Sequence, residues 1–276
     1  MFLISYIKNY TYHIAIAAFS ICIIGMVKIL TTTNPKIIGG WSQSLSQRPL
    51  EEFSVNSYGM VTNLNNFTTG SGWSPKETSA PQYGGVKILW TYGGEYCSPI
   101  SRPVSADEVS QIVQMTLQNG WDGVDFDDEC GMNIDNVIAA MQGLKKNGKQ
   151  TSYGFISGWG YNNPEKNDNG QEFNDKVAKL ARSNFCDRII HYCYGDAMWS
   201  DVHIAANVRS ALKRTINNGV PKEKVFLALT TVGLNFENLN YFLDAIFDFD
   251  IGGLFIWGYN DLVPEQRQLI LAKLAQ

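Results

Sequence analysis

The chain has few charged residues and no cluster of basic ones. Charged side chains make up 17% of its 276 residues, and the formal net charge is −4. Without a Lys- and Arg-rich segment in the part expected to fold, the sequence offers no positive surface of the kind that binds nucleic acid. The apolar share is 45%, which is ordinary for a globular protein and too high for a disordered one. We therefore expect a folded protein that does not bind nucleic acid.

Motifs typical of metal and nucleotide sites are also missing. The five cysteines show no CxxC spacing, so a zinc or dithiol site has no support. Neither a GxGxxG fingerprint nor a Walker sequence occurs, which argues against a nucleotide-binding sheet. We expect neither metal nor cofactor. For the four cysteines outside the N-terminal segment (Cys97, Cys130, Cys186 and Cys193), a bridge between the first two and free thiols are both open.

No uncharged apolar run reaches the roughly 20 residues of a complete membrane span. The longest, Ile14 to Val27, suits the core of a signal peptide better, and no clean cleavage site follows it. We expect residues 1–35 to form an uncleaved signal anchor, with cleavage and secretion as the second possibility and a buried core helix as the third. The first two place the protein in the secretory pathway, either anchored in a membrane through residues 14–30 or secreted.

Strand-like and helix-like segments alternate from residue 86 onward. The expected strands span residues 36–41, 53–63, 86–91, 121–129, 151–157, 188–194, 225–231 and 253–257. The expected helices span residues 105–117, 134–146, 172–184, 201–217 and 239–249, with a last one starting at Pro264. A capping box formed by Ser105 and Glu108 marks the first helix.

This alternation predicts a parallel sheet, most simply a single (β/α)8 TIM barrel of the α/β class over residues 36–276. A doubly wound open sheet is the alternative. It would usually carry the glycine-rich phosphate loop that this chain lacks.

The segment from Trp121 to Glu129 (WDGVDFDDE) combines five acidic residues with two good strand formers. Successive side chains of a strand point to opposite faces, so Asp125, Asp127 and Glu129 share one face. Three carboxylates on one face repel each other unless the site holds protons, cations or a substrate that exploits them. A surface loop would gain nothing from this spacing, so we interpret the segment as a catalytic strand. Its end would lie at the C-terminal rim, where such barrels keep their chemistry.

Residues 122–129 (DGVDFDDE) match the DGxDxDxE signature of glycoside hydrolase family 18, and the chain resembles that family. The family contains chitinases, endo-β-N-acetylglucosaminidases and inactive lectin-like members. Elsewhere the similarity is looser: Thr91 to Gly94 (TYGG) resembles the family's SxGG, and Tyr192 to Gly195 (YCYG) resembles its segment with a substrate-facing tyrosine. Trp257 sits where the family places a tryptophan under the scissile sugar. The resemblance covers roughly residues 36–272.

The resemblance implies a role for each carboxylate. Glu129 would be the general acid and then the base, and the substrate's own 2-acetamido oxygen would be the nucleophile, so that the anomeric configuration is retained. Asp127 would bind and orient the acetamido group. Asp125 would share a proton with Asp127, because two close carboxylates cannot both ionise cheaply. Tyr194 would donate its hydroxyl to the acetamido oxygen, with Tyr192 as the alternative.

Aromatic residues near strand ends suit stacking against sugar rings. The expected substrate-binding residues are Trp257, Trp159, Tyr192 and Trp41. The resemblance implies a partner that is an N-acetylglucosamine-containing polysaccharide or glycan, and we expect a monomer.

Departures from the family pattern bear on the substrate. Gly195 follows Tyr194 where many chitinases have Asp, and this pair, like Asp128, is closer to bacterial endo-β-N-acetylglucosaminidases. Gly93-Gly94 and Trp257 are closer to chitinases. We expect a glycosidase acting on β-1,4-linked N-acetylglucosamine in chitin or chito-oligosaccharides. The first alternative is an endo-β-N-acetylglucosaminidase acting on the chitobiose core of N-glycans, and the second is a catalytically inactive carbohydrate-binding protein.

Overall fold

The computed structural model describes residues 35–63, 67–94, 105–129, 131–156, 168–194 and 201–274. By its internal contacts the chain divides into two units, Met1–Pro35 and Lys36–Gln276. All described helices and strands belong to the second unit. Within the described ranges, no helix is both long enough and apolar enough to span a membrane.

Several predicted features lie outside the described residues. These are the signal or anchor segment, the substrate-binding candidate Trp159, and the cysteine pair Cys97 and Cys130. The other two cysteines expected in the folded part, Cys186 and Cys193, are buried free thiols.

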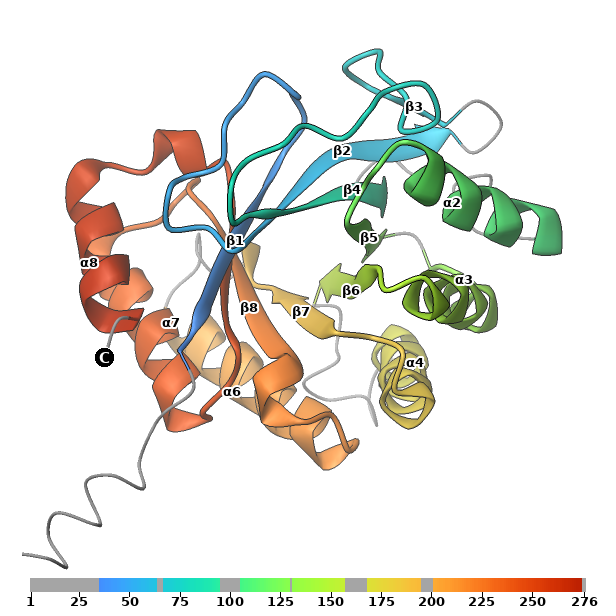
Figure 1. The fold of residues 1–276 in the computed structure, drawn as a ribbon. Helices are drawn as coiled ribbons and strands as arrows, with labels where there is room; N and C mark the ends of the chain where they lie inside the picture. The colour runs from blue at the N-terminus through green and yellow to red at the C-terminus, as the bar shows by residue number, and fades with distance from the viewer. Residues whose placement is uncertain are drawn as a thin grey trace, which may run out of the picture. The chain divides into compact units, whose positions relative to one another are not determined.

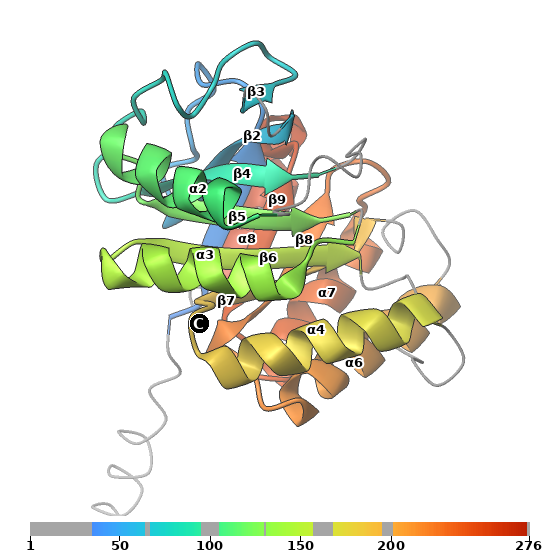
Figure 2. The ribbon, with the colours of Figure 1, turned by 90° about the vertical axis from the view of Figure 1, so that its right-hand side faces the viewer.

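Eight parallel strands close into a barrel (Figures 1 and 2). They are β1 (Ile37–Ser42), β2 (Val55–Asn63), β4 (Lys87–Gly93), β5 (Gly123–Asp128), β6 (Gln150–Ile156), β7 (Arg188–Tyr192), β8 (Val225–Thr230) and β9 (Gly253–Trp257). The order is β1-β9-β8-β7-β6-β5-β4-β2, and β1 also pairs with β2, so the ring is complete. The predicted barrel is confirmed, with each predicted strand present. A two-residue strand, β3 (Thr68–Thr69), pairs antiparallel with β2 and was not predicted.

Helices cover the barrel on the side of β4 to β9 (Figures 1 and 2). They are α2 (Ala106–Gln118), α3 (Ile134–Lys146), α4 (Asp168–Ser183), α6 (Asp201–Asn217), α7 (Phe236–Asp248) and α8 (Pro264–Leu274), with short 3-10 turns η3 (Lys222–Lys224) and η4 (Tyr259–Asp261). The capping box of Ser105 and Glu108 is confirmed. Helix α7 begins three residues earlier than predicted because Asn235 and Asn238 form a second capping box, which the apolar periodicity does not reveal.

Loops take the place of helices after β1 and β2. Residues 43–54 and 70–86, all described, contain no α-helix and run over the outside of the barrel at the top of Figure 1. The ring of Trp73 stacks on that of Trp121, with centroids 5.5 Å apart. The Tyr58 hydroxyl donates to the carbonyl of Gln47 (2.7 Å). These aromatic contacts cover the barrel beside β1 and β2, where the described residues form no α-helix.

The core has two layers. The outer layer lies between strands and helices and includes Val124 and Phe126 of β5. The inner layer fills the barrel with side chains from several strands, namely Trp41, Val55, Leu89, Ile190, Tyr192, Phe226, Ala228 and Phe255. Burying each large apolar side chain is worth about 1.5–3 kcal/mol. Strand β5 therefore directs its apolar side chains outward and its carboxylates Asp125 and Asp127 into the barrel, as its alternation predicts.

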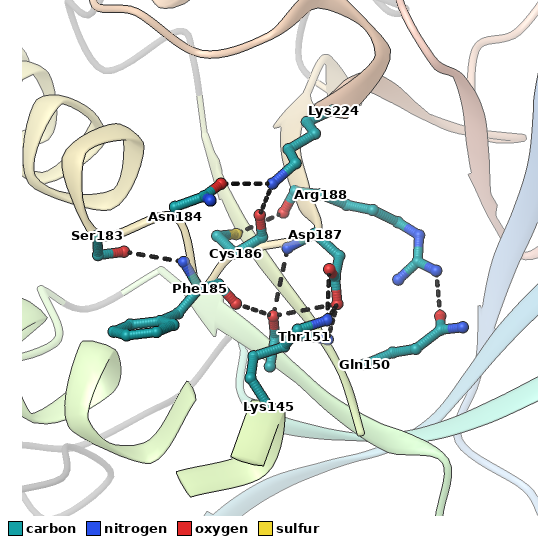
Figure 3. Close-up of polar contacts among 10 residues, drawn as sticks. All are labelled: Lys145, Gln150, Thr151, Ser183, Asn184, Phe185, Cys186, Asp187, Arg188 and Lys224. Carbon is teal, nitrogen blue, oxygen red and sulfur yellow. Dashed lines mark hydrogen bonds and ion pairs between the residues drawn. The ribbon is translucent and has the colours of Figure 1, made fainter. Parts of the chain in front are cut away.

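A polar cluster lies at the N-terminal end of the barrel strands, where β6 and β7 begin (Figure 3). Lys145 of α3 forms an ion pair with Asp187 (2.7 Å), and Asp187 accepts the backbone N–H of Thr151 (3.0 Å). Lys224 donates to the carbonyl of Cys186 (3.2 Å). Because these polar groups bind one another and join neighbouring elements, we assign the cluster a structural role.

Candidate active site

A pocket of about 700 Å³ opens at the C-terminal end of the barrel strands. Five predicted site residues line it: Asp127, Glu129, Tyr194, Trp257 and Trp41. Asp127 lies in β5, and Glu129 follows directly after the last residue of that strand. The C-terminal end of parallel strands is where barrels of this type place their chemistry.

Asp125 lies two residues before Asp127 on the same face of β5 and is fully buried. Trp41 Nε1 donates to its Oδ2 (2.6 Å), Thr91 Oγ1 donates to the same oxygen (3.3 Å), and Ser152 Oγ donates to Oδ1. Thr91 and Ser152 reach it because they are its register partners on the strands to either side. Burial raises the pKa of Asp125, and the Ser152, Trp41 and Thr91 donors oppose that shift.

Asp127 combines burial with close negative charge. Burial raises its pKa well above the ordinary value, and the carboxylates of Glu129 and Asp125 raise it further, while the Tyr192 hydroxyl opposes the shift. A carboxyl group in this setting holds a proton at a pH where an exposed Asp has lost it. The pKa is thus raised for both carboxyl groups on the inner face of β5, Asp125 and Asp127.

Two glycines let the backbone of β4 approach Asp127. Gly93 and Gly94 both have φ of +101°, a conformation that favours glycine. The Gly94 N–H donates to the carbonyl of Asp127 (2.9 Å), and a Cβ on Gly93 would overlap that same oxygen. The sequence TYGG is therefore explained by the close contact between the end of β4 and the acidic strand.

Two tyrosines of the β7 segment lie against each other. Tyr194 lines the pocket, and its ring stacks on that of the buried Tyr192, with centroids 5.1 Å apart and an interplanar angle of 3°. The Tyr192 ring also meets the edge of Trp41 (5.6 Å), and it has room only because residue 154 is glycine, where a Cβ would overlap its hydroxyl. Burial, followed by the nearby Asp127, raises the pKa of both tyrosines. Tyr194 is thus a hydrogen-bond donor at neutral pH.

The aromatic candidates differ in exposure. Trp257, at the end of β9, is partly exposed and presents its ring to the pocket. Trp41 also lines the pocket but is only 3% exposed, and its indole N–H is used by Asp125. Trp41 thus lines the pocket and also holds the buried Asp125 carboxyl group in place through a hydrogen bond.

One wall of the pocket was not identified from the sequence. It consists of Met60 of β2, Thr69 of β3 and the two residues that follow it, Gly70 and Ser71, together with Gln43. A turn directly after β3 is closed by the Gly72 N–H, which donates to the Thr69 carbonyl (3.0 Å). The run TTGSG, residues 68–72, contains this turn signal, but such a signal gives no indication of where the turn lies in space.

The described residues contain no group of three or more His, Cys, Asp or Glu side chains that could hold a metal ion. The pocket is lined by the carboxyl group of Asp127, whose pKa is raised, by a second carboxyl group at the rim, Glu129, and by the aromatic side chains of Tyr194, Trp257 and Trp41. Its volume is within the range of pockets that bind small ligands, about 300–1,000 Å³. This set of groups suits acid–base chemistry on a polar ring-shaped substrate.

No family model matches the chain, and no curated protein matches it. Solved structures do share its fold. A fungal endo-β-N-acetylglucosaminidase from glycosyl hydrolase family 18 superimposes with a TM-score of 0.61 at 15% identity, over 88% of this chain and 98% of that chain.

Two chitinases give similar results. The enzyme from Chromobacterium violaceum has a TM-score of 0.61 at 11% identity, over 87% of this chain and 99% of that chain. The catalytic domain of a hyperthermophilic chitinase from Pyrococcus furiosus has a TM-score of 0.56 at 14% identity, over 81% and 84%. At these identities the similarity shows that this chain has the barrel fold of these proteins.

Proposed function

We propose that the protein is a glycoside hydrolase that cleaves β-1,4-linked N-acetylglucosamine with retention of configuration. The observation that carries the proposal is the convergence of Asp127, Glu129 and Tyr194 on one pocket, directly above the buried Asp125. The chitinases and the endo-β-N-acetylglucosaminidase that share the fold support it.

The proposed reaction uses the substrate's 2-acetamido oxygen as the nucleophile. Glu129, the carboxylate nearest the rim, protonates the leaving glycosidic oxygen and later takes a proton from water. Asp127 accepts a hydrogen bond from the acetamido N–H and holds its carbonyl against the anomeric carbon. Asp125 keeps a proton available to Asp127, and the Tyr194 hydroxyl donates to the acetamido oxygen. The roles of Asp125 and Tyr194 as proton carriers agree with the raised pKa of Asp125, Asp127 and Tyr194.

An endo-β-N-acetylglucosaminidase acting on the core of N-glycans is the second candidate. The fungal enzyme named above matches this chain over nearly its whole length. Only five residues separate the end of β8 at Thr230 from the start of α7 at Phe236. A connection this short has no room for an inserted domain between β8 and α7, and a pocket edge left uncovered there can admit a branched glycan.

Two substrates separate the candidates. The products of chito-oligosaccharides and of a high-mannose glycoprotein should be analysed after incubation with the protein. Cleavage of the oligosaccharides supports the first candidate, and cleavage of the glycoprotein alone supports the second. Binding of oligosaccharides without any cleavage would instead favour an inactive carbohydrate-binding protein.

The variant Glu129→Gln tests the chemistry. Loss of a general acid costs about 10²–10⁴-fold in rate, so we expect kcat to fall by that factor while Tm and oligosaccharide affinity change little. Glu265→Gln, at an exposed position in the first turn of α8, is the matched control and should behave as wild type. Hydrolysis by Glu129→Gln at the wild-type rate would contradict the mechanism.

We also propose that residues 14–30 direct the protein into the secretory pathway and anchor it in a membrane. The apolar run Ile14 to Val27 supports this.

A further inference from the structure

A buried carboxylate lies on the reverse side of the acidic strand. Asp128 immediately precedes Glu129, but its side chain points outward from the barrel and is fully buried. Its Oδ2 accepts hydrogen bonds from Tyr153 Oη of β6 (2.6 Å) and Lys176 Nζ of α4 (2.8 Å). Its Oδ1 accepts the backbone N–H of Met132 (2.7 Å). We call Asp128, Tyr153 and Lys176 the β5 clamp.

Stability alone does not account for this ion pair. Lys176 is only 5% exposed, and the Asp128 side chain is fully buried. Two charges in such a place lose their hydration, and apolar side chains of similar size often replace them without loss of stability. Lys176 also contacts the exposed Glu172 (2.8 Å) and the ring of Phe173 (4.9 Å), so its position is fixed from several sides.

The clamp holds the chain on both sides of Glu129. The Asp128 side chain is fixed by β6 and α4, and its Oδ1 ties the end of β5 to Met132, four residues further on. The Met132 methyl group fills the space beside Gly93, where a Cβ would overlap it. Glu129 lies between these two fixed points, and its side chain lines the pocket.

We propose that the β5 clamp positions Glu129 for proton transfer, with Tyr153 and Lys176 as positioning residues that act through Asp128. The inference deepens the proposed function and rests on it for the catalytic effect. Lys176 is also proposed to act electrostatically. Its positive charge balances the carboxylate of Asp128, which otherwise adds to the negative potential at Asp127.

Two combined variants separate positioning from stability. Asp128→Leu/Tyr153→Phe/Lys176→Met replaces the clamp by apolar side chains, whereas Asp128→Asn/Lys176→Met removes the charges but keeps an acceptor for the Met132 N–H. The Asn variant should melt within about 3 °C of wild type, and the triple variant, in which the buried Met132 N–H loses its acceptor, about 5 °C lower. Lys176→Met alone, which leaves a buried carboxylate unpaired, should melt about 10 °C lower.

The two combined variants should differ in kcat. Small displacements of a catalytic group can cost about 100-fold, so we expect that loss in the triple variant with KM nearly unchanged, and less than about tenfold loss in the Asn variant. Lys179→Met is the matched control: Lys179 lies on the same helix and pairs with Asp135 (3.0 Å), but both are exposed. It should change neither Tm nor kcat.

Amide hydrogen exchange gives a readout that needs no hydrolysis. The Met132 amide should exchange slowly in wild type and in the Asn variant, and faster by at least about tenfold in the triple variant. A folded triple variant with wild-type kcat, or Met132 exchange that is the same in all three proteins, would overturn the proposal. If wild type cleaves neither glycan, the proposed function and the catalytic part of this inference fail together. Met132 exchange then decides the positional part by itself.

Discussion

Asp127 shows how a single residue can lower stability for the sake of chemistry. Its pKa is raised by burial, by Glu129 and by Asp125. Between the pKa of Asp in the unfolded chain, about 3.9, and this raised value, the native state binds more protons than the unfolded state. The free energy of unfolding therefore falls as the pH rises through this interval. Above it, the folded protein carries the full cost of an ionised buried carboxylate.

Asp127→Asn removes that cost, and we expect it to stabilise the protein while abolishing hydrolysis. Each unit of pKa shift is worth about 1.4 kcal/mol, and 1 kcal/mol corresponds to about 2–4 °C of Tm in a domain of this size. The variant should melt several degrees above wild type at pH 7, and the difference should vanish near pH 3. Thermal unfolding followed across this pH range checks the sign. A variant that melts below wild type at pH 7 and above it at pH 4 would contradict the argument.

Residue positions were predictable where they depend on local geometry alone. The period of two in β5 indicated correctly that Asp125 and Asp127 face away from Val124 and Phe126. It gave no sign that Trp41, 84 positions away, would donate to Asp125. Such contacts follow from barrel closure and helix packing, which the pattern of one segment does not contain.

At the scale of elements, the loops that replace two helices also shape the pocket. The Trp73 indole N–H donates to the Gln43 carbonyl (3.0 Å), which joins the two loops. The Trp73 carbonyl accepts from the Thr69 N–H (2.9 Å), and Gln43 and Thr69 both line the pocket. The stack of Trp73 on Trp121 anchors this wall to the barrel.

Trp73→Ala should therefore weaken both folding and substrate binding. Removing a half-buried tryptophan, and with it the stacking contact to Trp121, should lower the free energy of unfolding by about 2–3 kcal/mol. KM should rise several-fold with kcat largely kept, because the wall moves but the carboxylates do not. Trp73→Phe retains the stacking and loses only the hydrogen bond to Gln43, which is worth about 1 kcal/mol. Urea unfolding and steady-state kinetics provide the measurements. An unchanged urea midpoint and KM in Trp73→Ala would refute the assignment.

Strands and helices could be predicted from the sequence where their apolar residues recur at regular spacing. The strands and helices from residue 86 onward have regular apolar spacing, and the expected elements of this part are all present. The β3 strand, Thr68–Thr69, has only two residues and no period to detect. β3 and the turn after it supply Thr69 and Gly70 to the pocket, so the part of the site that the sequence did not predict is built from irregular backbone.

At the scale of the whole molecule, the barrel is closed by pairing within a single stretch of chain. β1 pairs with β9 on one side and β2 on the other, so the described sheet needs no strand from outside residues 36–276. The contacts within Lys36–Gln276 form one compact unit. Strands β1, β2, β4, β7, β8 and β9 contribute buried apolar side chains to both core layers, so loss of one of them exposes both. Cooperative folding of this unit by itself is the expected consequence.

We therefore expect residues 36–276, produced without residues 1–35, to melt within about 2 °C of the full chain measured in the same detergent, and to keep its hydrolytic rate. The full chain should sediment with membranes after cell lysis, and the shortened one should stay in the supernatant.

Removal of seven further residues, through Ser42, deletes β1 and opens the barrel between β2 and β9. This protein should not fold. A clear loss of Tm in the 36–276 protein would mean that the two units stabilise each other. A full chain that stays in the supernatant would instead refute the proposed anchor and leave the barrel argument intact, because closure depends only on strands that follow residue 36.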